Sequence, residues 1–181
     1  MWTRLLPRKP RRPPRSRRFD SMTSKTYPAS PHPEPKAVVI FCADPRFLAA
    51  TTSFITEELG YKEGEYLPLS VPGGIASLSE PFALPKDFKV LKEGLQFYLE
   101  HMGSISEVIL INHEDCRKYH ALVEKLGILN KLRGTMAERQ LDDLKKVGEL
   151  ASGLVARRIK VRQYYAKFAN EEHTQVVFEA V

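Results

Sequence analysis

The stretch AVVIFCADPRF, residues 37–47, joins a buried strand to the start of a helix and so decides the fold class. It begins with the apolar run AVVIFCA, which is rich in β-branched residues, as in a strand buried on both faces of a parallel sheet. Asp44 and Pro45 follow, and this pair favours a helix start because aspartate caps helices and proline fits their first turn. Apolar residues then recur at helical spacing up to Gly60, where we expect the helix to end.

The rest of the chain alternates between further strands and helices. We expect strands at 65–71, 107–112, 160–168 and 174–181, and helices at 86–102, in the 120s and at about 135–156. This alternation predicts an α/β fold with a mainly parallel central sheet and helices on both of its faces, the last two strands pairing at an edge. In such folds ligands bind beyond the carboxyl ends of the strands. The sequence contains no P-loop, dinucleotide-binding fingerprint or internal repeat.

Charge and proline content divide the chain into two parts. Residues 1–36 carry ten Lys and Arg residues against two acidic ones, a net charge of +8, whereas residues 37–181 carry 18 basic and 20 acidic residues, a net charge of −2. Eight of the 13 prolines also precede residue 37. Such a segment has too few apolar residues to bury a core. We therefore predict a disordered basic tail over 1–36 and a single folded domain over 37–181.

The basic tail is rich in arginine but carries only weak signals for a targeting or nucleic-acid-binding segment. No aromatic residues are interleaved with its arginines to stack on bases, so we expect no nucleic-acid contact from it. Its prolines oppose the amphipathic helix of a transit peptide, and Met22 is an alternative start of the chain. The sequence has neither an apolar signal segment nor a run of about 18 apolar residues. We expect a cytoplasmic protein without a membrane span, in which the two cysteines stay reduced.

Two of the predicted strand ends carry residues that bind metal ions. Cys42 ends the first strand, and His113 and Cys116 lie three residues apart in the turn INHEDC, residues 111–116, which leaves another strand. Zinc accepts two thiolates and one imidazole, and three protein ligands leave a fourth tetrahedral position open, as in catalytic sites. The sequence therefore predicts a zinc-binding domain with an open metal position.

Asp44 and Arg46 lie next to the first predicted ligand. In an extended chain Cys42 and Asp44 point to the same side, so that the carboxylate would lie beside the metal. Arg46, on the first helical turn, could fold back and hold this carboxylate with two parallel hydrogen bonds. The clamp would orient Asp44 as an acceptor for a proton of the coordinated water. It would also decide whether Asp44 stays off the zinc or takes the fourth position itself.

Each of these residues, taken alone, also has a simpler interpretation. Cys42 would be a small core residue, and His113 a hydrogen-bonded polar residue at a strand end. Asp44 would cap the helix, and Arg46 would be solvated. A closed zinc site is a further alternative, and it needs a second histidine because the chain has no third cysteine. The candidates for that histidine are His101, His120 and His173.

The two motifs resemble those of the β-class carbonic anhydrases. Residues 42–46, Cys-Ala-Asp-Pro-Arg, match that family's C-x-D-x-R, and residues 113–116, His-Glu-Asp-Cys, match its H-x-x-C. Their order and strand-end positions also agree. The likeness covers most of the chain from about residue 37 to the second motif, and the basic tail has no part in it.

The resemblance implies a role for each motif residue. It implies three zinc ligands, which are Cys42, His113 and Cys116. It also implies that Asp44 and Arg46 form the catalytic dyad beside the metal. The implied cofactor is therefore Zn²⁺.

The resemblance also implies an activity and an assembly. The activity is zinc-dependent reversible hydration of carbon dioxide to bicarbonate and a proton, with zinc supplying the attacking hydroxide. Gly73 and Gly74 would form a turn beside the active site after the second strand. Because the family builds its sites at a dimer interface, we expect a homodimer or a larger even oligomer.

The chain departs from the family's pattern around the predicted site. Residues 70–73, Ser-Val-Pro-Gly, stand where many members have R-N-A-G, and Pro45 replaces a small residue. Asn112 and Arg117 replace the glycines that flank the H-x-x-C motif. These changes leave two alternatives open. One is hydrolysis of a related small molecule, carbon disulfide or carbonyl sulfide, and the other is a zinc-binding homologue without catalytic activity.

Overall fold

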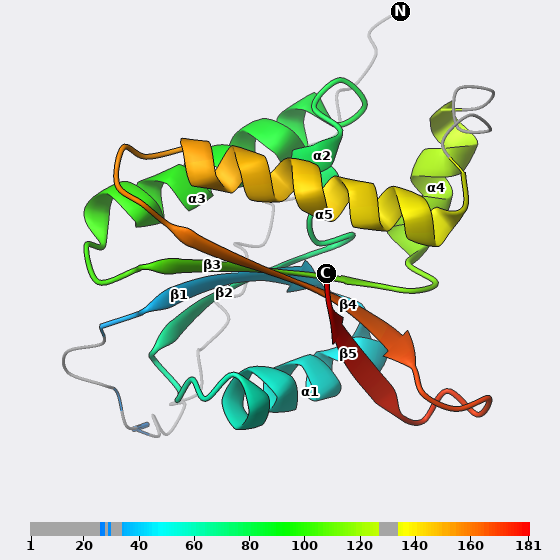
Figure 1. Ribbon diagram of the computed structural model, residues 1–181, viewed down its shortest axis with the longest axis horizontal. Coiled ribbons are helices and arrows are strands. Elements are labelled where there is room, and N and C mark those ends of the chain that lie inside the picture. Colours follow the sequence, from blue (N-terminus) through cyan, green and yellow to red (C-terminus); the bar gives the residue numbers. More distant parts are fainter. Residues whose placement is uncertain (1–25, 28, 30–33, 127–133) are drawn as a thin grey trace, which may run out of the picture.

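A five-stranded sheet forms the centre of this computed structural model, which describes residues 26, 27, 29, 34–126 and 134–181 (Figure 1). Its strands are β1 (Ala37–Cys42), β2 (Tyr66–Val71), β3 (Glu107–His113), β4 (Lys160–Phe168) and β5 (Val176–Ala180). They lie in the order β2-β1-β3-β4-β5. The first four are parallel, and β5 pairs with β4 in antiparallel orientation at the edge. The predicted fold class and the pairing of the last two strands are confirmed.

Helices cover both faces of the sheet, but unequally. The chain forms α1 (Pro45–Ser53), a short π-helix η1 (Phe54–Glu58), α2 (Ala76–Ser79), α3 (Pro85–His101), α4 (Arg117–Leu126) and α5 (Met136–Gly153). In Figure 1, α1 lies on one face, whereas α2, α3, α4 and α5 lie on the other. No helix among the described residues has the length and apolar character needed to cross a membrane.

The alternation of side chains along β1 and β3 builds two apolar layers, one on each face. Every residue of β1 is buried, as expected for a central strand of a parallel sheet. One layer joins the sheet to α3 and α5 and contains Val38, Ile40, Val108 and Leu110. The other joins it to α1 and contains Val39, Phe41, Ile109 and Ile111. These layers pack β1 and β3 between the helices on the two faces of the sheet.

The predicted helix start after β1 is confirmed. Asp44 is the N-cap of α1, its carboxylate accepts a hydrogen bond from the backbone N–H of Arg46, and Pro45 occupies the first turn. The helix continues as the π-helix η1, and the chain leaves it at Gly60, where φ is +76°. The short helix α2 was not predicted. Most of the predicted basic tail (1–25, 28 and 30–33) lies outside the described residues, so its disorder and the domain boundary at residue 37 stay predictions.

Candidate metal centre

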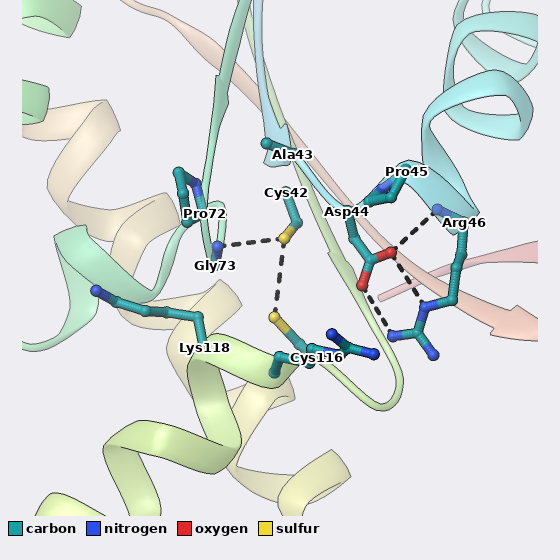
Figure 2. A pocket seen from close by; sticks show the side chains of 10 residues that line it. Cys42, Ala43, Asp44, Pro45, Arg46, Pro72, Gly73, Cys116 and Lys118 are labelled. Atoms are coloured by element: carbon teal, nitrogen blue, oxygen red, sulfur yellow. Dashed lines mark hydrogen bonds and ion pairs between the residues drawn. The ribbon is translucent and has the colours of Figure 1, made fainter.

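A pocket opens at the edge of the sheet where β1 and β2 end, as predicted for a parallel sheet (Figure 2). It has a volume of about 260 Å³. The residues lining it come from the β1–α1 turn, the turn after β2 and the start of α4, and they include Cys42, Asp44, Arg46, Gly73 and Cys116. Five of the seven residues expected at the site therefore line one cavity.

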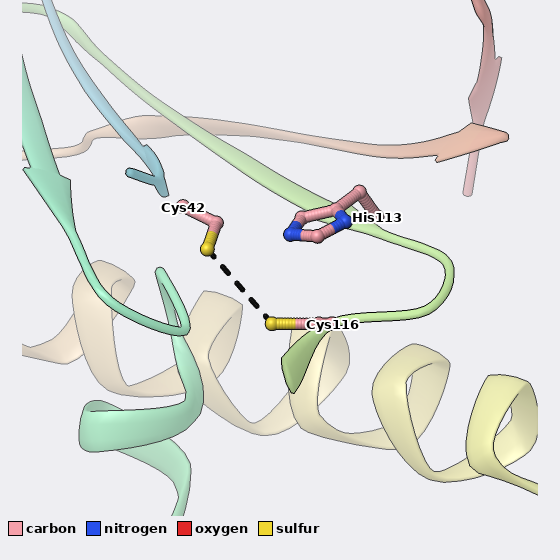
Figure 3. Close-up of side chains that lie close together, drawn as sticks. All are labelled: Cys42, His113 and Cys116. Atoms are coloured by element: carbon pink, nitrogen blue, oxygen red, sulfur yellow. Dashed lines mark hydrogen bonds between the residues drawn. The ribbon is translucent and has the colours of Figure 1, made fainter. Parts of the chain in front are cut away.

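Cys42, His113 and Cys116 come together beside this pocket (Figure 3). Cys42 is the last residue of β1, His113 is the last residue of β3, and Cys116 directly precedes α4. Because β1 and β3 are adjacent parallel strands, their carboxyl ends meet at the same edge. The three side chains are 8%, 3% and 2% exposed, so the cluster is buried.

The spacing of the ligand atoms suits one tetrahedral ion. The two Sγ atoms are 3.8 Å apart. Two sulfurs bound to one zinc at about 2.3 Å are separated by about 3.8 Å in tetrahedral geometry, whereas a disulfide needs about 2.05 Å. The ligand atoms of all three residues lie within 4.8 Å of one another. Both cysteines are free, so the pair fits a metal site and not a disulfide.

The imidazole of His113 is oriented with one nitrogen toward the two sulfurs (Figure 3). Its Nδ1–H donates to the carbonyl of Glu114 at 2.7 Å, which leaves the Nε2 lone pair free, and the Phe47 ring packs against it at 4.2 Å. Nε2 is buried and has no hydrogen-bond partner among the described residues. A buried nitrogen without a partner is costly, and metal-bound histidines typically donate their other N–H in this way. The donor set therefore fits zinc.

The two thiols are hydrogen-bonded to each other, and Cys42 also accepts a hydrogen bond from the backbone. Either sulfur can be the donor of the hydrogen bond between the two thiols. This contact lowers the pKa of Cys42 and raises that of Cys116. The backbone N–H of Gly73 also donates to the Cys42 sulfur, at 3.2 Å. Metal binding would hold both residues as thiolates and release the protons that they carry.

Within the part of the chain that the structure describes, no fourth protein ligand joins this cluster. Among the described residues, the one group of three or more side chains suited to a metal is Cys42, His113 and Cys116. His101 contacts the carbonyl of Phe97 in its own helix, and His120 pairs with Asp115. His173 stacks on Phe168. A closed site completed by one of these histidines is therefore not formed.

Asp44 and Arg46 form the expected bidentate pair at the pocket (Figure 2). Arg46 Nε donates to Asp44 Oδ1 at 3.1 Å, and Nη2 donates to Oδ2 at 2.8 Å. These hydrogen bonds hold the pKa of Asp44 below its usual value and raise that of Arg46. The side chain of Asp44 is 10% exposed, against 33% for Arg46, so the carboxylate is the more enclosed partner. Asp44 is thus both the helix cap and the partner of Arg46.

Asp115 also holds Arg46, and sequence reasoning missed it. Arg46 Nη1 donates to the Asp115 carboxylate at 2.7 Å, and Nη2 donates to the Asp115 backbone carbonyl at 2.9 Å. Asp115 has a φ of +51°, in the left-handed region that aspartate tolerates better than most residues. Its position inside the H-x-x-C turn gave a weak signal. The contact links the turn that carries Cys116 to the turn that follows Cys42.

Gly73 and Gly74 form the tight turn after β2 that the resemblance implied. Both have positive φ, +84° and +54°. A Cβ on Gly74 would lie 2.9 Å from the backbone nitrogen of Cys42, and one on Gly73 would lie 2.5 Å from Lys118 Cγ. The missing side chains let the turn approach the metal ligand closely enough for the Gly73 N–H to reach its sulfur.

Replacing Gly74 with alanine is expected to destabilise the protein by at least about 1–2 kcal/mol, since alanine in the left-handed region is strained and would also press on Cys42. Urea unfolding of the metal-free protein measures this. The matched control is Gly94→Ala in α3, where a Cβ meets nothing within 4 Å. Because that position is helical, we expect a gain of about 0.5–1 kcal/mol. Equal effects at the two positions would contradict the proposed role of the turn.

Comparison with known proteins identifies the fold. No protein-family model and no curated protein matches the sequence. Among solved structures, β-carbonic anhydrase isoform I from Trichomonas vaginalis aligns with a TM-score of 0.54 at 15% identity, covering 85% of this chain and 87% of that one. A carbonic anhydrase from Streptococcus mutans aligns with a TM-score of 0.50 at 15% identity, with the same coverage of 85% and 87%. An apo carbon disulfide hydrolase has a TM-score of 0.48 at 13% identity, covering 80% and 78%.

The chain has the fold of the β-carbonic anhydrases. The first two of these structures align with TM-scores of 0.54 and 0.50 over most of both chains. The resemblance drawn from the two sequence motifs is therefore confirmed at the level of the fold.

Proposed function

We propose that the protein is a divergent β-class carbonic anhydrase that catalyses zinc-dependent reversible hydration of carbon dioxide to bicarbonate and a proton. The observation that carries this proposal is the buried cluster of Cys42, His113 and Cys116 with the Asp44–Arg46 pair at the adjoining pocket. The fold supports it because structures with this architecture include carbonic anhydrases.

Each residue of the candidate site would have a separate role in the proposed reaction. Cys42, His113 and Cys116 would hold zinc, which lowers the pKa of coordinated water to about 7 and so supplies hydroxide near neutral pH. We assign Asp44 the role of hydrogen-bond acceptor for the attacking water, since an ionised carboxylate can only accept. Arg46 holds both oxygens of Asp44 and so fixes the direction from which it accepts. Asp115 in turn holds Arg46 from the opposite turn.

The basic residues at the start of α4 support an anionic product. Arg117 and Lys118 line the pocket together with Arg46. The Lys118 ammonium also forms an ion pair with the Asp87 carboxylate, with 3.5 Å between Nζ and Oδ2. Arg117 is exposed, so its large side chain can reach the pocket without filling the ligand cluster. Cations around a small cavity raise the local concentration of an anion such as bicarbonate.

Stopped-flow measurement of carbon dioxide hydration tests the proposal. We expect zinc-loaded protein to accelerate hydration well above the buffer rate, with a rate that rises as pH increases through about 7. The same protein after removal of zinc with a chelator is the control and should show no acceleration. Absence of a rate at every pH in protein that holds zinc would contradict the proposed activity.

A substrate panel separates the two alternative functions. Carbon disulfide or carbonyl sulfide hydrolysis would use the same ligands and the same dyad. Pro72 and Arg117, two of the residues that depart from the family's pattern, line the pocket and so alter the surface that a substrate meets. Turnover of either sulfur compound without carbon dioxide hydration would assign that hydrolysis instead. Zinc binding without turnover of any of the three would assign a non-catalytic role.

We also propose that the protein is a cytoplasmic homodimer or larger even oligomer. Three large apolar side chains in and before α3 are exposed, namely Phe82 (99%), Val90 (73%) and Phe97 (53%). Val90 also lines a second cavity that shares Pro72 and Lys118 with the candidate site. A partner chain packed over Val90 would cover apolar surface next to the pocket. A monomer in light scattering at all concentrations would contradict the assembly.

A further inference from the structure

A buried polar network lies behind the metal centre, between the sheet and the helices α4 and α5. Its side chains are Asn112 on β3, Tyr119 on α4, Gln140 on α5 and Tyr165 on β4, and none is more than 4% exposed. Polar side chains at such depth are costly unless they are hydrogen-bonded, and a satisfied network fixes the elements that it joins. The contacts of Gln140 show what this network holds.

Gln140 is hydrogen-bonded directly to the backbone of the predicted ligand His113. Its Nε2 donates to the His113 carbonyl at 2.8 Å, and its Oε1 accepts from the Tyr165 hydroxyl at 2.7 Å. A carbonyl can only accept, so the amide nitrogen must be the atom that faces His113. Gln140 is 0% exposed and has both ends of its amide engaged. Its orientation is therefore determined by its surroundings.

The hydrogen bond from Gln140 to His113 lies at the end of β3, where β1 no longer pairs with this strand. The pairing of β1 with β3 ends with Ile40 opposite Leu110, three residues before His113. On the other side β4 continues to pair with β3 as far as His113, opposite Ala166. The end of β3 is thus held by one neighbouring strand and by the amide of Gln140. A buried carbonyl needs such a donor.

Asn112 extends the network to the helix that follows the second thiol ligand. Its Nδ2 donates to the Tyr119 hydroxyl at 3.0 Å and lies 3.2 Å from the Gln140 backbone carbonyl. Tyr119 lies three residues after Cys116, in the first turn of α4. The network therefore joins α5 to the elements that carry both ligands of the H-x-x-C turn. It also gives a physical role to Asn112, where the family resemblance implied a glycine.

We propose that Gln140 is a positioning residue of the metal centre. Its amide holds the His113 backbone at the end of β3, so that the Nδ1–H meets the Glu114 carbonyl and Nε2 faces the two sulfurs. This inference rests on the proposed metal site and is independent of the substrate. Hydrogen-bonded groups behind a metal ligand set its orientation and therefore the affinity of the site.

The test is zinc affinity in the variant Gln140→Met, which keeps the side-chain length and removes the donor. We expect the zinc dissociation constant, measured by competition with a chromophoric chelator, to rise about 10- to 100-fold. The absorption bands of the cobalt-substituted variant should also shift, because they report the geometry of the ligands. A change of overall stability alone would not move these bands.

The matched control is Gln163→Met, which removes a similar hydrogen bond between β4 and α5. Gln163 Nε2 donates to the Leu144 carbonyl at 3.0 Å, with no link to a ligand. We expect its zinc affinity to stay within about threefold of wild type. Equal losses in the two variants, or wild-type affinity and cobalt spectrum in Gln140→Met, would overturn the positioning role.

Two other outcomes are possible, namely a Gln140→Met variant that does not fold and a wild-type protein that binds no zinc. If Gln140→Met does not fold, Gln140→Asn takes its place, since its amide is one methylene too short to reach the His113 carbonyl, and the same loss is expected. Wild-type zinc affinity in Gln140→Asn would then overturn the proposal. If the wild-type protein itself binds no zinc, the proposed metal site fails, which is a different result from a variant that binds as well as wild type.

Discussion

Replacing Cys42 with serine should remove metal binding and activity together. In the proposed site Cys42 would supply one of two thiolates, and its sulfur lies 3.8 Å from that of Cys116, the separation of two sulfurs on one tetrahedral zinc. Serine keeps the size of the side chain but offers a hydroxyl that stays protonated at neutral pH. We expect the zinc content to fall from about one ion per chain to below about a tenth, and carbon dioxide hydration to fall to the buffer rate.

Two measurements on the Cys42→Ser protein separate loss of the ligand from loss of the fold. Circular dichroism should show the wild-type secondary structure, because β1 is held by both apolar layers and not by this side chain alone. Thr51→Val serves as a control for changing a buried polar residue, since Thr51 is 3% exposed on α1 and lies outside the ligand group. It should keep its zinc. Stoichiometric zinc in folded Cys42→Ser would show that this cysteine is not a ligand.

The predictions that succeeded rest on patterns that neighbouring residues create. The apolar run of β1 and the cap formed by Asp44 and Pro45 are local, so the strand and the helix start could be predicted from the sequence. The meeting of Cys42 with His113 and Cys116 followed from one further rule, that parallel strands end at the same edge of the sheet.

The features that were missed depend on contacts between residues far apart in the chain. Asp115 meets Arg46 across 69 positions, and its place inside the H-x-x-C turn only weakly distinguishes its carboxylate from a solvated one. Gln140 and Asp143 lie on the buried face of α5, where a sequence pattern predicts apolar residues. Polar residues in such places are explained only by their partners in the folded protein. The same holds for Asn112, whose role becomes visible only with Tyr119 beside it.

Asp44→Asn is expected to separate metal binding from turnover. Asp44 lines the pocket without belonging to the ligand cluster, so the variant should bind about one zinc per chain, as wild type does. An amide offers one acceptor oxygen where the carboxylate offers two, so it loses half of the bidentate contact with Arg46 and the negative charge. We expect the rate of carbon dioxide hydration to fall about 10²- to 10⁴-fold.

The matched control for Asp44→Asn is Asp87→Asn, which makes the same change of charge at the rim. Asp87 lies 3.5 Å from Lys118 and is half exposed, so the hydration rate should stay within about threefold of wild type. The two variants together distinguish a role of the Asp44 carboxylate from a general effect of negative charge near the pocket. Full activity in Asp44→Asn would contradict the assignment of this residue as the acceptor.

The pH dependence of Asp44→Asn gives a further check. Hydrogen bonds from Arg46 hold the pKa of Asp44 below its usual value. The Asp44 carboxylate is therefore charged throughout the neutral range, and it becomes protonated only as pH falls through that lowered pKa. A rise of the rate near pH 7 must therefore come from another group, which we assign to water on the metal. The residual activity of Asp44→Asn should accordingly keep the midpoint of the wild-type profile. If the pH profile of the hydration rate in Asp44→Asn has no midpoint near pH 7, the Asp44 carboxylate itself titrates during turnover. That result would contradict the assignment of the midpoint to water on the metal.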